Sequence, residues 1–129
     1  MPTLPWTTVR EASPDADVVV LASRLELGSR LRIPGFLRAA MAIRRQVRNA
    51  PGALGVSLIA QPARKTFWTL SAWNDQAALD DFVRARPHVD VMTRYRPLLR
   101  EAMFRTWSTP GGSLPIPWDE AKRRLAASS

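Results

Sequence analysis

The only histidine of this 129-residue chain, His88, is the residue best suited to acid–base chemistry near neutral pH. An imidazole can accept a proton, donate one, or bind a haem iron. His88 directly follows Pro87, where a predicted helix breaks, so a structural role in capping or connecting two helices is the alternative. We predict that His88 is the catalytic residue.

Three tryptophans lie on predicted strands and could form the walls of a ligand pocket: Trp68, Trp73 and Trp107. Trp73 ends its strand where the next helix begins, a place where pockets form. An indole can stack on a planar ligand and donate one N–H hydrogen bond. We predict that these tryptophans bind substrate, and burial in the core is the alternative.

Two arginines, Arg24 and Arg105, lie within predicted strands, where charged residues are uncommon. Either guanidinium could pair with an anionic or phenolate group of a ligand, or could simply project from a strand end. The absence of cysteine and the single histidine exclude thiolate and histidine-rich metal sites within one chain, so we expect no metal. The sequence also contains no phosphate-binding glycine motif and no G-x-S-x-G elbow.

The formal net charge of +8 raises the question of a nucleic-acid partner. The basic residues are spread over several helices, which is typical of solvated faces. The strand RKTFWTLSAW also lacks the glycine of the RNA-recognition motif, so a basic nucleic-acid-binding module is only the weakest alternative. The sequence shows no secretory signal and no apolar run near the ~20 residues that span a membrane, so we expect a cytoplasmic protein without a membrane partner.

These residues must be positioned by the elements around them. Periodicity and turn residues predict strands at 17–27, 53–61, 64–73 and 101–107. Helices are predicted from Pro34 to before Pro51, from Asn74 or Asp75 to before Pro87, and over 89–100 with a bend near Pro97. The order β-α-β-β-α-β predicts a ferredoxin-like α+β domain with an antiparallel sheet and helices on one face.

We expect an extended N-terminal arm over residues 1–16, the ferredoxin-like domain over 17–107, and a C-terminal loop and short helix over 108–129 that packs on the domain. The sheet face away from the helices is expected to carry apolar residues that need a cover. The side chains assigned to it are Phe67, Thr69, Ser71 and Ile59. A second copy of the sheet is the simplest cover, so we predict a homodimer.

The run FWTLSAWNDQAALDDFV followed by RPHVDVM resembles the antibiotic-biosynthesis-monooxygenase group of dimeric α+β barrel proteins. The ending RTWSTPGGSLPIPWDEAKRRL is similar to that of a bacterial family of unknown function in the same superfamily, and spheroidene-monooxygenase-like proteins are distant relatives. The resemblance covers roughly residues 17–126. It implies a homodimer with a pocket between sheet and helices, and by motif position it implies Trp73 and His88 as site residues.

Some proteins that this chain resembles are cofactor-free oxygenases of electron-rich polycyclic phenols, others degrade or bind haem, and some are cyclases. The haem degraders use an Asn on the first strand, where this chain has VVVLASRLEL. We therefore expect cofactor-free oxidation of an aromatic or polyketide-like small molecule in a hydrophobic pocket. His88 would be the base, Trp73 and Trp68 pocket walls, and Arg24 or Arg105 the anion partner. A haem-binding or non-catalytic ligand-binding protein of the same fold is the alternative.

Overall fold

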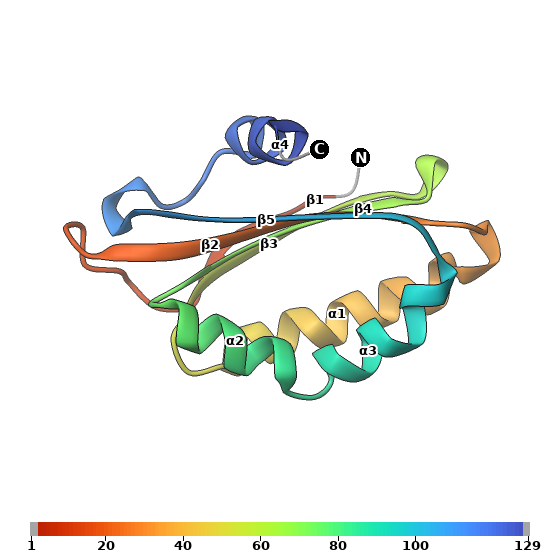
Figure 1. Ribbon diagram of the computed structural model, residues 1–129, viewed down its shortest axis with the longest axis horizontal. Coiled ribbons are helices and arrows are strands. Elements are labelled where there is room, and N and C mark those ends of the chain that lie inside the picture. Colours follow the sequence, from red (N-terminus) through yellow and green to blue (C-terminus); the bar gives the residue numbers. More distant parts are fainter. Residues whose placement is uncertain (1–2, 128–129) are drawn as a thin grey trace.

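The computed structural model describes residues 3–127 as a five-stranded sheet with helices on both of its faces (Figure 1). The strands are β1 (Thr3–Thr8), β2 (Asp17–Leu27), β3 (Ala53–Gln61), β4 (Thr66–Trp73) and β5 (Leu99–Pro110). The helices are α1 (Ile33–Asn49), α2 (Gln76–Arg84), α3 (His88–Tyr95) and α4 (Trp118–Ala127).

The strands follow the order β1-β3-β4-β2-β5, and every neighbouring pair is antiparallel. From β2 to β5 the chain runs β-α-β-β-α-β, with the second helical segment divided into α2 and α3. The predicted ferredoxin-like α+β fold with an antiparallel sheet is therefore confirmed. The two strands predicted at 17–27 and 53–61 have those bounds in the structure.

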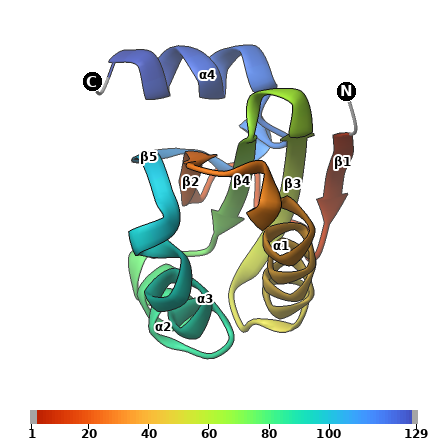
Figure 2. The ribbon, with the colours of Figure 1, turned by 90° about the vertical axis from the view of Figure 1, so that its right-hand side faces the viewer.

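Helices α1, α2 and α3 cover one face of the sheet (Figures 1 and 2). Asp75 caps α2, because its side chain accepts a hydrogen bond from the backbone N–H of Ala78 at 2.8 Å. The prediction of helix over 89–100 is wrong at its end. Helix α3 stops at Tyr95, a short 3₁₀ turn spans Arg96–Leu98, and Leu99 already pairs with Leu27 of β2. Pro97 lacks the backbone N–H needed to continue an α-helix, so β5 begins at Leu99 rather than at 101. At its other end β5 runs to Pro110 rather than ending at 107.

The N-terminal segment is part of the sheet, because β1 pairs with the edge of β3. The sequence pattern showed no strand alternation there, and we had expected only an extended arm. Gly55 of β3 allows this pairing, since a Cβ atom at Gly55 would overlap the indole of Trp6.

The second sheet face is covered by the chain's own C-terminal helix, α4. Ile116, Ala121 and Leu125 are buried there against a cluster that includes Val20 and Leu70. The indole Nε1 of Trp118 donates a hydrogen bond to the Ser57 hydroxyl at 3.0 Å. Because α4 covers this face, the expectation that a second copy of the chain must cover it is wrong. The homodimer itself stays a prediction.

The expected assignment of side chains to the two faces is also wrong for β4. Phe67, Thr69 and Ser71 face α1–α3 rather than the surface that we expected a partner to cover. Of the four residues assigned to the outer face, only Ile59 lies on it, directly opposite Trp68 in the neighbouring strand. Both faces of β4 are apolar, so alternation alone did not show which face the long helices cover.

Candidate functional site

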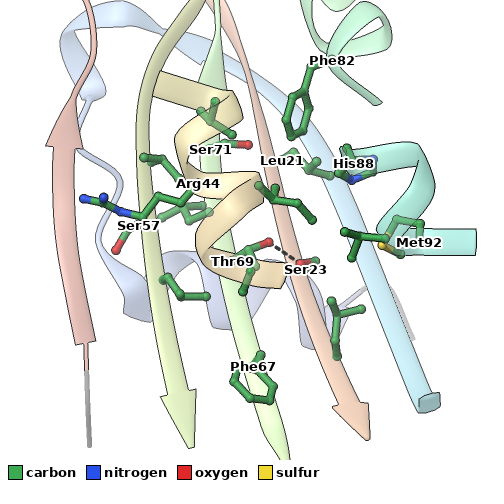
Figure 3. A pocket seen from close by; sticks show the side chains of 18 of the residues that line it. Leu21, Ser23, Arg44, Ser57, Phe67, Thr69, Ser71, Phe82, His88 and Met92 are labelled. Atoms are coloured by element: carbon green, nitrogen blue, oxygen red, sulfur yellow. Dashed lines mark hydrogen bonds between the residues drawn. The ribbon is translucent and has the colours of Figure 1, made fainter. Parts of the chain in front are cut away.

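A cavity of about 80 Å³ lies between the sheet and helices α1 and α3 (Figure 3). Strands β2, β3 and β4 form its floor, and most of its wall is aliphatic or aromatic. Phe36 of α1 and Phe82 of α2 are both buried beside it. An apolar lining with few polar groups is typical of small-molecule sites, but this cavity alone is smaller than the ~300 Å³ at the lower end of their range.

His88 lies in the wall of this cavity, at the first position of α3. Its ring is half-buried, and its centroid is 4.8 Å from that of Phe82. The ring atom Nδ1 lies 3.1 Å from the carbonyl oxygen of Val83. Because a carbonyl oxygen can only accept a hydrogen bond, Nδ1 carries the proton and Nε2 has the free lone pair.

The environment of His88 favours the neutral imidazole. Burial lowers its pKa below the ordinary value of 6.5, and the hydrogen bond to the Val83 carbonyl opposes this shift only in part. At neutral pH the unprotonated form therefore predominates. A neutral imidazole with a free Nε2 can act as a general base.

Gln46 of α1 holds the segment that carries His88. Its side-chain Oε1 accepts a hydrogen bond from the backbone N–H of His88 at 2.9 Å, and its Nε2 donates to the carbonyl oxygen of Phe82 at 3.1 Å. One side chain thus fixes both the end of α2 and the start of α3. This role of Gln46 could not be predicted from the sequence, because nothing in the helical pattern distinguishes Gln46 from the other polar residues of α1.

Two hydroxyl groups form the polar part of the cavity floor. Ser23 of β2 lies directly opposite Thr69 of β4, and their side chains are hydrogen-bonded to each other (Figure 3). Polar residues on the apolar face of two strands were a usable signal in the sequence. The pairing of these two strands, however, was needed to bring the hydroxyls together.

Trp73 lies behind the cavity wall and does not line the cavity. Its side chain is fully buried, its ring centroid is 4.7 Å from that of Phe82, and its Nε1 donates to the Ser71 hydroxyl at 2.9 Å. Trp73 therefore supports two residues, Phe82 and Ser71, that do line the cavity. Its direct contact with a ligand stays a prediction.

The other four predicted binding residues lie on the opposite face of the sheet, which α4 covers: Trp68, Trp107, Arg24 and Arg105. Successive strand residues point to opposite faces, so Trp68 and Trp73, five positions apart, cannot share one. Arg24 lies over the Trp68 ring at 5.5 Å and forms ion pairs with Glu26 and Glu101. The structure does not bring these four residues to His88.

Trp107 and Arg105 illustrate two different environments on that face. Trp107 is buried in the core beneath α4, and the guanidinium of Arg124 lies 4.6 Å from its ring centroid. Arg105 lies opposite Ala22 on the edge strand and is exposed. Their predicted contacts with a substrate would require a second site on this face.

Arg44 is a further cation beside the cavity, and its aliphatic stem lines it. The guanidinium points away toward β1, where it donates to the Thr7 hydroxyl at 2.9 Å (Figure 3). Within residues 3–127 no group of three or more His, Cys, Asp and Glu side chains could hold a metal ion. No helix in the same residues is long and apolar enough to cross a membrane.

Neither a family model nor a curated protein matches the chain. Solved structures do resemble it. SnoaB, a cofactor-independent oxygenase from Streptomyces nogalater, is 18% identical with a TM-score of 0.60, covering 78% of this chain and 99% of SnoaB. An antibiotic biosynthesis monooxygenase is 15% identical with a TM-score of 0.62, covering 69% of this chain and 95% of the other.

A conserved protein from Methanosarcina mazei Go1 is 11% identical with a TM-score of 0.62, and the match covers 70% of this chain and 90% of that protein. Identities this low establish likeness of the fold and nothing finer. The strand order, the helices over one sheet face and these matches agree with one another. The fold of this chain is therefore similar to that of the cofactor-independent oxygenase and the antibiotic biosynthesis monooxygenase.

Proposed function

We propose that the chain is a cofactor-free oxygenase of a small, electron-rich aromatic or polyketide-like molecule. The observation that carries this proposal is the neutral His88, whose imidazole lines an apolar cavity. Similarity to a cofactor-independent oxygenase supports it at the level of the fold. In this proposal His88 is the base and the apolar cavity is part of the substrate site.

In this proposal His88 Nε2 removes the proton from a phenolic or enolic hydroxyl of the substrate. The resulting anion gives one electron to O₂, and the substrate radical and superoxide combine at a ring C–H carbon to form a peroxide anion. Protonated His88 returns the proton to this peroxide, which loses water and leaves a new carbonyl on the ring, so that one oxygen atom enters the substrate and the other enters water. The Ser23–Thr69 hydroxyls can hydrogen-bond a substrate oxygen and orient the ring. The apolar wall excludes water from the reacting centre.

Haem, the cofactor of the alternative function, does not fit within this inner cavity, which can enclose only part of an aromatic substrate. The volume of about 80 Å³ is smaller than the ~150 Å³ of an engineered protein cavity that holds benzene. A four-ring macrocycle would require the helices to separate from the sheet. We therefore derive no step through haem.

Oxygen consumption with a panel of electron-rich phenols and naphthols tests the proposal. We expect turnover that EDTA leaves unchanged and that falls at least ~100-fold in kcat when His88 is replaced by Gln. Arg94→Gln is the matched control, because Arg94 is an exposed residue of α3 that lines neither the cavity nor the groove beside it. Undiminished turnover in His88→Gln would exclude His88 as the base.

A further inference from the structure

A groove of about 520 Å³ lies on the outer side of His88, between helices α2 and α3 and the edge strand β5. It shares four lining residues with the inner cavity: Leu21, His88, Met92 and Phe104. These four side chains form the boundary between the two spaces. The imidazole of His88 therefore adjoins both the closed cavity and the open groove.

The groove runs along one side of α3. His88, Met92 and Arg96 follow one another at a spacing of four residues, which places them on one helical face. Phe104 and Thr106 of β5 stand opposite on a common strand face, two positions apart. At a rise of 1.5 Å per residue, Arg96 lies about 12 Å along the helix axis from His88.

The groove is apolar in its middle. Six large hydrophobic residues are exposed in the described part of the chain, and three of them line this groove. They are Val83 (37% exposed), Val89 (37%) and Phe104 (50%). Such clustering marks a binding surface more often than scattered exposed residues do.

The charged residues in the groove lining are two arginines, Arg84 and Arg96, and one carboxylate, Asp80. The carboxylate of Asp80 accepts a hydrogen bond from Gln76 at 2.9 Å, and Arg84 pairs with Asp81 at 3.8 Å and donates to the Asp80 carbonyl at 3.3 Å. Arg96 has no hydrogen-bond or ion-pair partner for its guanidinium among residues 3–127. A free guanidinium beside an apolar surface suits a carboxylate or another anionic group.

We propose that the groove is the outer half of one substrate site, and that it binds an anionic group carried on a chain by the aromatic ring that His88 deprotonates. The inner cavity is too small for a whole ring, so a ring beside His88 must extend into the groove. A chain leaving that ring passes over Val89 and Phe104 toward Arg96. The substrate class is thus an aromatic or polyketide-like acid, and this inference depends on the proposed function for the position of the ring.

Two small probes test the inference by binding alone: 3-(4-hydroxyphenyl)propanoate and its neutral amide. They share the phenol and differ in the charge of the tail. Because His88 is the only histidine, its imidazole resonance reports binding of either probe without ambiguity. We expect the carboxylate to bind three- to tenfold more tightly than the amide. Arg96→Gln should remove this difference.

Arg94→Gln is the control, since it makes the same change in net charge two residues away, at the end of α3 and outside the groove. It should retain the preference for the carboxylate. Equal affinities of wild type for the two probes, equal losses in both variants, or no binding of either probe would overturn the inference. None of these outcomes depends on oxygen consumption. If the amide binds at His88 and the carboxylate binds no more tightly, the groove does not bind an anionic group, and the proposed oxygenase function is unaffected.

Discussion

The side chain of Gln46 accepts a hydrogen bond from the backbone N–H of His88 at 2.9 Å. The same amide donates to the Phe82 carbonyl at 3.1 Å, so α1 holds the junction between α2 and α3 in a fixed position. The imidazole itself is anchored within that junction, by Nδ1 on the Val83 carbonyl. The direction of the free Nε2 therefore depends on a residue that lies outside the cavity.

Replacing Gln46 by Leu should lower stability and activity together. Both hydrogen bonds are lost, at a cost of about 1–3 kcal/mol in the free energy of unfolding. The backbone N–H of His88 then has no partner, whereas the Phe82 carbonyl still accepts from the N–H of Ala85 at 3.2 Å. The displaced imidazole should lower kcat about tenfold with little change in KM. Urea unfolding and steady-state kinetics measure the two effects.

The Gln46→Glu variant distinguishes the contributions of the two hydrogen bonds. A carboxylate can still accept from the backbone N–H of His88, but it cannot donate to the carbonyl oxygen of Phe82. We expect kcat between that of wild type and that of the Leu variant. Asn49→Leu is the matched control, since the Asn49 amide bonds only to the Arg45 carbonyl on the exposed side of α1. A Gln46→Leu enzyme with wild-type kcat would show that His88 does not need this support.

The protonation of His88 should make both the reaction rate and the free energy of unfolding depend on pH. Its pKa in the folded protein lies below 6.5 because of burial, so the unfolded chain binds more protons in the window beneath 6.5. The free energy of unfolding should therefore fall as the pH drops through this window, and the contribution of His88 should be constant above it. The rate should rise with pH as His88 loses its proton, and it should reach half of its maximum below pH 6.5.

An NMR titration of the single imidazole measures this pKa directly. Substitution of His88 by Gln should remove the part of the pH dependence of stability that lies in this window. A folded-state pKa at or above 6.5 would contradict the neutral base.

The contributions of Ser23 and Thr69 to the free energy of unfolding should depend on each other. Thr69→Val leaves the buried Ser23 hydroxyl without its partner, which costs about 1–2 kcal/mol of stability. The double variant Ser23→Ala, Thr69→Val removes both groups and should be close to wild type in stability, although it binds phenols more weakly. A double-mutant cycle from urea unfolding tests this coupling, and strictly additive losses would refute it.

The sequence predicted the elements well where local chemistry determines them. Asp75 caps α2 as expected, and the strand at 17–27 ends where Gly28 and Ser29 follow it. The strand β1 escaped prediction because its pairing with β3 depends on residues about fifty positions away. The length of β5 also depends on its partner, β2, rather than on its own pattern.

The site was predicted only in part, because it depends on which face of the sheet the helices cover. The alternation of side chains places Trp68 and Trp73 on opposite faces of β4. Both faces are apolar, however, so the sequence does not show which of them the helices α1–α3 cover. The hydroxyl pair needs the register of β2 against β4, and the support of His88 needs the packing of α1 on the junction after α2. His88 was identifiable because only one titratable imidazole exists in the chain.

The packing of α4 on the sheet can be tested at Leu125, which is 1% exposed and lies in the cluster beneath the helix. Leu125→Ala should lower the free energy of unfolding by about 2–5 kcal/mol, because the truncated side chain leaves a cavity. Arg123→Ala, on the exposed side of α4, should change it by less than about 0.5 kcal/mol. Both variants should bind phenols at His88 like wild type, because the sheet separates α4 from the inner cavity. If Leu125→Ala is as stable as wild type, α4 does not cover this face in solution, and the face becomes available to a second copy of the chain.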